Sequence, residues 1–84
     1  MIMPSVHFNG TSREQLLETY ERAVKAVHTA HQALVSAYPN GRDYYPQGAI
    51  VIYTAVDEHL HRVELLKSVK HELEQIIQHI TEAE

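Results

Sequence analysis

The residues best suited to chemistry lie in one proline- and glycine-rich stretch, AYPNGRDYYPQGAI, at residues 37–50. Arg42 supplies a planar guanidinium that can grip a phosphate or a carboxylate. Tyr44 and Tyr45 supply aromatic faces that each carry a hydroxyl, and Asp43 can pair with Arg42 or cap nearby backbone. We interpret these residues first as the cover over the open end of a helical hairpin, with Arg42 paired to Asp43. The alternative is a ligand-binding site at these four residues, since loops carry function more often than core faces do.

Histidine is the second candidate, since the chain has seven in 84 residues. His28 and His31 are three apart on one helical face, a spacing that can hold a metal. The hairpin register could bring His59 to the same height, with Asp57 or Glu58 alongside. A carboxylate-bridged site also needs inward acids on the first helix, where the acids lie at the far end. We therefore predict no bound metal or cofactor, and His31 as a packed polar residue between helices; a site of His28, His31 and His59 is the alternative.

The sequence contains no recognisable catalytic set. Cysteine is absent, no glycine-rich phosphate loop is present, and no serine lies in a nucleophile-elbow or Ser-x-x-Lys context. Two antiparallel helices also enclose little volume unless several chains assemble. We expect a protein that is not an enzyme.

The first helix is predicted for residues 11–38. Thr11-Ser12-Arg13-Glu14 has the form of a capping box. Pro39 disfavours helical geometry at Tyr38 and ends the element, after which Asn40-Gly41 are expected to turn the chain. Between these signals the spacings of three and four residues describe a heptad seam, formed by Leu17, Tyr20, Val24, Val27, His31, Leu34 and Tyr38.

The second helix is predicted for residues 49–81, with an apolar stripe that drifts around the helix instead of keeping a strict heptad. Its members are Ile52, Val56, Leu60, Val63, Leu66, Val69, Leu73, Ile76, Ile77 and Ile80. The run AIVIYTAV at 49–56 has the β-branched content of a strand, but a lone strand would have no partner here. We interpret it as the first turns of the helix, and an all-round apolar helix must be buried all round. The run therefore predicts a subunit interface.

These elements predict one all-α domain, residues 1–84, built as an antiparallel two-helix hairpin that oligomerises into a helical bundle. Residues 1–10 form an N-terminal arm and residues 39–48 the inter-helix loop. With the bend centred near residue 44, His28 and His31 would lie level with residues 56–60. In an oligomer the loop could close on a neighbouring chain, where these residues would join its site: Tyr20, Arg22, Lys25 and His28.

Charge and hydropathy exclude several classes of partner. The net charge of −4, with seven basic residues scattered among eleven acids, argues against duplex nucleic acid, whose ligands usually show a basic stripe. No apolar run approaches the ~20 residues that span a bilayer, and the first residues lack the basic segment and apolar core of a signal peptide. We expect a cytoplasmic protein without a membrane partner.

The segments HFNGTSREQLLE and NGRDYYPQG, each followed by a helix, resemble small uncharacterised helical proteins of tailed phages and prophages. The resemblance implies an accessory role in the host bacterial cytoplasm, where such proteins inhibit host proteins or sequester nucleotide signals of antiviral defence, usually as homo-oligomers without catalysis. The first expectation is therefore a homo-oligomer that sequesters a small anionic ligand such as a cyclic nucleotide. The alternative is a protein–protein interaction module, a host-protein inhibitor or virion-assembly helper, and the third is a histidine-based metal-binding protein.

Overall fold

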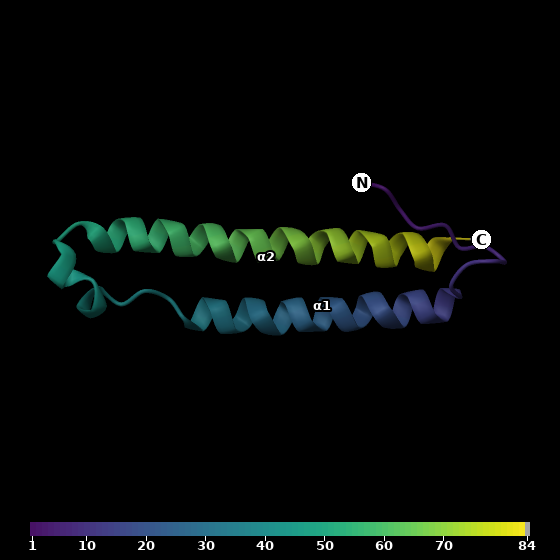
Figure 1. Ribbon diagram of the computed structural model, residues 1–84, viewed down its shortest axis with the longest axis horizontal. Coiled ribbons are helices and arrows are strands. Elements are labelled where there is room, and N and C mark those ends of the chain that lie inside the picture. The colour runs from purple at the N-terminus through teal and green to yellow at the C-terminus, as the bar shows by residue number, and fades with distance from the viewer. Residues whose placement is uncertain (84) are drawn as a thin grey trace.

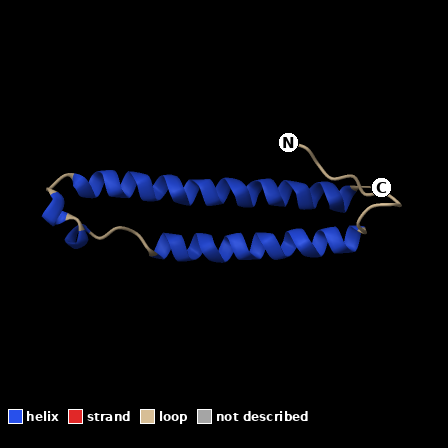
Figure 2. Cartoon of the chain, viewed as in Figure 1, coloured by secondary structure: helices blue, strands red, loops and turns tan. Residues whose placement is uncertain are grey.

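The chain folds into a hairpin of two long antiparallel helices, as a computed structural model that describes residues 1–83 shows (Figure 1). The elements in chain order are α1 (Arg13–Ser36), η1 (Gly41–Asp43), η2 (Tyr45–Gln47) and α2 (Val51–Glu82), where η denotes a 3₁₀ turn. No strand occurs in this part of the chain (Figure 2). The predicted all-α hairpin is confirmed, and the ambiguous run at 49–56 is helical from Val51 onward.

Helix α1 begins and ends inside its predicted bounds. The Oγ of Ser12 accepts a hydrogen bond from the Gln15 backbone N–H at 3.2 Å, so Ser12 is the N-cap and a capping box from Thr11 is wrong by one residue. At the other end the Ala37 N–H bonds back to the carbonyls of Ala33 and Leu34. The helix therefore stops two residues before Tyr38, and no glycine is needed to end it.

The hairpin is a rod and not a compact globule. Its principal extents are 61 × 20 × 16 Å and its radius of gyration is 18.5 Å, whereas a compact chain of this length has a radius of about 12 Å. Of residues 1–83, only His59 and Ile80 are buried, at 5% and 0% exposure. A single chain therefore has a packed seam but no closed core.

The arm before α1 covers one end of this seam. It folds back over the C-terminal end of α2 (Figure 1), where His79 Nε2 donates to the Pro4 carbonyl at 3.0 Å. The Arg13 guanidinium donates to the Ala83 carbonyl. Ile80 lies in this closed end and is fully shielded from water.

The connection between the helices covers the other end. Helix α2 begins well beyond the end of α1, and residues 37–50 run beside its first turns (Figure 1). The Tyr38 ring meets the His59 ring edge-on, with centroids 5.8 Å apart and planes at 79°, an arrangement that aromatic quadrupoles favour. His59 is buried beneath this contact.

The overhang changes the register from the predicted one. Lys70 Nζ lies 3.1 Å from His28 Nδ1, so His28 sits about ten residues further along α2 than the predicted level of residues 56–60. The prediction assumed a tight bend near residue 44. Instead the connecting residues lie alongside α2, because this placement shields apolar side chains in the first turns of that helix from water.

The shielded side of α2 also differs from the predicted drifting stripe. Its buried and half-buried positions include an unbroken heptad with spacings of four and three residues: Ile52, Val56, His59, Val63, Leu66, Lys70, Leu73, Ile77 and Ile80. His59 and Lys70 occupy two positions of this heptad. Because they are polar, the apolar residues of α2 alone do not reveal the repeat. Leu60 and Val69, assigned to the stripe from sequence, are 47% and 44% exposed.

Candidate functional site

The predicted loop site lies at the end of the rod far from both termini (Figure 1). The Asn40 side chain accepts from the Arg42 N–H at 3.0 Å and starts η1. Pro46 follows Tyr45 in η2, at a helical start where a missing N–H costs little. Gly48 then adopts φ 123° and ψ 153°, the single positive φ among residues 1–83. The backbone of the loop is thus specified turn by turn.

Large side chains gather in the open at this end. Tyr45, Ile50 and Tyr53 are 72%, 77% and 70% exposed, and Arg42 is exposed beside them in the chain. We call Arg42, Tyr45, Ile50 and Tyr53 the tip. Ile2 and Phe8 of the N-terminal arm are also exposed, at 96% and 98%, but among the described residues only the tip combines exposed tyrosines with an arginine, two residue types enriched in protein interfaces.

The other two predicted loop residues behave differently. Tyr44 is half-buried and its N–H bonds to the Gly41 carbonyl, so it joins η1 to η2. Asp43 lies in η1 and is exposed. The ion pairs found in residues 1–83 lie on the helices and include neither Arg42 nor Asp43, which leaves both charges available to a partner.

The structure places the helical members of the predicted site elsewhere. Lys25 and His28 are exposed on α1 and line a shallow, open depression of about 520 Å³. The rest of its lining is Val24, Thr29, Lys70 and Glu74. Eight residues of α1 separate His28 from Ser36, or about 12 Å along the axis. Within one chain, the depression and the tip are separate sites.

Two further residues named from sequence contribute to neither. Tyr20 is half-buried in the seam between the helices. Arg22 pairs with Glu18 at 3.7 Å across one turn, with both side chains 73% exposed, a contact of little energetic weight.

The three histidines of the alternative metal site do not converge. His28 lies beside Lys70, eleven residues and therefore about 16 Å from His59 along α2. His31 is half-buried in the seam, and His59 is the residue that packs fully. Across the described residues, no three side chains of histidine, aspartate or glutamate are grouped so as to hold a metal ion. The expected height match of His59 with His28 is wrong because of the register.

Two buried side-chain nitrogens, Arg13 Nε and His59 Nε2, have no hydrogen-bond partner among the described residues, and His59 is the one that lies in the seam of α2. Its Nε2 is buried and has no hydrogen-bond partner, and a buried unsatisfied nitrogen is costly. The seam position of this residue could have been found by testing α2 for a heptad that admits histidine and lysine. The same test finds Lys70, the residue of the depression that sequence reasoning missed.

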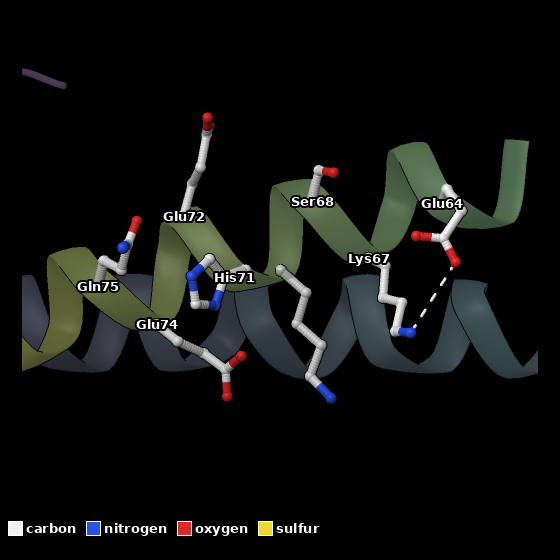
Figure 3. A pocket seen from close by; sticks show the side chains of 8 residues that line it. Glu64, Lys67, Ser68, His71, Glu72, Glu74 and Gln75 are labelled. Carbon is white, nitrogen blue, oxygen red and sulfur yellow. Dashed lines mark ion pairs between the residues drawn. The ribbon is translucent and has the colours of Figure 1, made fainter. Parts of the chain in front are cut away.

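The outer side of α2 is polar and open (Figure 3). Lys67 pairs with Glu64 at 3.8 Å, while Glu72 points away from His71 and Glu74 in that view. The space along this side, about 640 Å³, is an open shelf lined by polar residues. Such a surface is typical of a solvated helix face.

No family model, curated protein or solved structure matches the chain. Between residues 1 and 83, neither long helix is apolar enough over a sufficient length to cross a membrane.

Proposed function

We propose that the protein is a non-enzymatic interaction module that recognises a partner protein through its tip. The observation that carries this proposal is the exposure of Arg42, Tyr45 and Ile50 on the loop and of Tyr53 in the first turn of α2. Tyrosine and arginine are enriched among the residues that dominate protein–protein binding energy. A fixed loop also reduces the ordering cost of association.

A protein partner fits this end better than a small molecule does. Small-molecule sites are concave and bury most of their ligand, and the tip is a projecting end of the rod (Figure 1). Under the resemblance to phage-encoded helical proteins, the partner would be a host protein or a virion component.

The test compares what the tagged chain and its variants retain in cells that naturally carry its gene. A Tyr45→Ala, Tyr53→Ala double variant should lose a specific partner more than tenfold, because central aromatic contacts cost about 2 kcal/mol or more each. Its melting temperature should stay the same, since both side chains are exposed. Lys67→Ala, on the outer side of α2, is the control and should retain the partner. Equal recovery with the double variant would exclude the tip.

A second candidate function rests on the depression beside α1. Lys25, His28 and Lys70 bring three nitrogen-bearing side chains together there, with Glu74 as the one acid in its lining. This supports sequestration of a small anionic ligand such as a cyclic nucleotide in the depression. Calorimetric titration with a panel of cyclic nucleotides should give heat that Lys25→Ala abolishes and Arg42→Ala leaves unchanged. No heat with any nucleotide would remove this candidate.

A further inference from the structure

The hairpin has two broad sides, and one of them carries exposed small and apolar residues from both helices. Beyond the seam that faces α2, α1 carries a second run with spacings of four and three residues, made only of small uncharged residues: Thr19, Ala23, Ala26, Ala30, Ala33 and Ala37. The last four of these are exposed. A second heptad on one helix is the pattern of a helix that packs against two neighbours, and one chain supplies a single neighbour.

The contact between His28 and Lys70 shows on which side this run lies. At about 100° per residue, Ala26 and Ala30 lie about 160° around α1 from His28. On α2, Lys67 shares one side with Lys70 and Glu74, and Leu65 and Val69 lie about 160° from Lys67. The alanines of α1 and these apolar residues of α2 therefore share the side opposite His28.

We call this surface the alanine face: Ala26, Ala30, Ala33, Leu65, Val69 and Ile76. Leu65 and Val69 are 53% and 44% exposed, although both are large apolar residues in the middle of a long helix. The opposite side carries lysine, histidine and glutamate. Glu58, Arg62 and Glu72 also lie on the side of Leu65, where Glu58 pairs with Arg62. The exposed Leu65 and Val69 lie between these charges, and they are the part of this side that a protein partner would cover.

The accessible surface of the chain indicates how much area a partner would have to bury. Its accessible surface is 6481 Å² at 9.6 kDa, whereas a compact monomer of that mass exposes about 5,100 Å². The excess is about 1,400 Å² per chain. Twice that amount falls within the range of about 2,000–5,000 Å² that obligate homodimers bury, so a second copy accounts for the missing burial.

The alanine face is also complementary to itself. Because Lys70 lies beside His28 and His59 beside Tyr38, Leu65 lies level with Ala33 across the hairpin. By the same register Val69 lies level with Ala30. A two-fold axis parallel to the rod keeps these levels and exchanges the helices. The large residues of each α2 then fill the space above the alanines of the other α1.

We propose that the alanine face is the interface of a symmetric homodimer, a four-helix bundle in which every neighbouring helix is antiparallel. The bulky side chains of α2 from one copy pack on the alanine run of α1 from the other. Both tips then lie at the same end of the bundle, where two copies of a binding surface can act together. The proposal stands on the helix faces alone and is independent of what the tip binds.

The first experiment measures mass in solution by size-exclusion chromatography with light scattering. The wild-type chain should run at about 19 kDa, twice its 9.6 kDa. Ala30→Glu places a charge in the alanine face and should halve the mass, while Gln32→Glu, exposed on the other side of α1, should leave it unchanged. A wild-type mass of one chain, or of three or more, would overturn the proposal. So would equal behaviour of the two variants.

The second experiment tests the arrangement and does not depend on how Ala30→Glu folds. The chain has no cysteine, so introduced pairs report without background. An Ala33→Cys, Leu65→Cys variant should form a covalent dimer on mild oxidation, because the two positions of different copies face each other. A Gln32→Cys, Lys67→Cys variant, on the opposite side, should stay single-chain under the same conditions. Cross-linking of the control pair alone, or of neither pair, would refute the interface.

Discussion

Gly48 is the residue whose replacement tests the loop most directly. It stands before the first turn of α2 with φ 123° and ψ 153°, a region that side-chain-bearing residues essentially do not occupy. Space is not the obstacle, because a Cβ placed there would meet only Val51 Cγ2 at 3.9 Å, an ordinary contact. Gly48→Ala therefore isolates the backbone conformation from packing.

The expected magnitude follows from two opposed effects. Holding alanine in that conformation costs about 1–3 kcal/mol. Against it, alanine restricts the unfolded chain and returns about 0.4–1 kcal/mol. The net loss in the free energy of unfolding should be about 1–2 kcal/mol, a fall in melting temperature of roughly 5–15 °C for a domain of this size.

Gly41→Ala is the matched control. Gly41 has no positive φ, and a Cβ there would meet nothing within 4 Å, so alanine should be neutral or stabilising by up to about 1 kcal/mol. Urea denaturation of both variants at one fixed protein concentration gives the comparison. If Gly48→Ala unfolds at the same urea concentration as Gly41→Ala, the loop does not hold the conformation described and the reasoning fails.

Two other substitutions test local features by the same denaturation assay. Ser12→Ala should lower the free energy of unfolding by about 1 kcal/mol through loss of the N-cap bond, while Thr11→Ala should change it little. A larger loss for Thr11→Ala than for Ser12→Ala would instead support the capping box predicted from sequence. His59→Leu should stabilise by about 1 kcal/mol, because relief of the unsatisfied Nε2 at about 1–3 kcal/mol outweighs loss of the edge-on Tyr38 contact at about 0.5–1.5 kcal/mol. The exposed His61→Leu serves as its control, and a destabilised His59→Leu would show that the buried imidazole has a partner in solution.

The two surfaces assigned to interaction have different physical characters. The tip combines aromatic side chains with a cation at a projecting end, which suits recognition of a different molecule. The six residues of the alanine face are apolar and match their own register, which suits a second copy. Tyr45→Ala should therefore lower partner recovery without changing the mass, whereas Ala30→Glu should halve the mass.

The helices and their approximate limits could be predicted from sequence because the signals are local. The first helix ends at Ser36, two residues before the end predicted from Pro39, and the predicted seam of α1 is half-buried from Leu17 to Leu34. Tyr38, its last predicted member, lies beyond the helix and is 55% exposed. The polar members of the α2 seam, His59 and Lys70, were harder to place. A pattern restricted to apolar side chains takes Leu60 in place of His59 and Val69 in place of Lys70, and both Leu60 and Val69 are exposed.

The sequence alone therefore determined that this chain is two helices joined by an irregular, aromatic-rich loop, since periodicity, caps and prolines act within a few residues. The tertiary structure alone decided the register between the helices. That register depends on how the loop covers the overhanging first turns of α2, a packing choice made by residues far apart in sequence. The register in turn separates the tip from Lys25 and His28, places His59 away from the other histidines, and sets Leu65 level with Ala33.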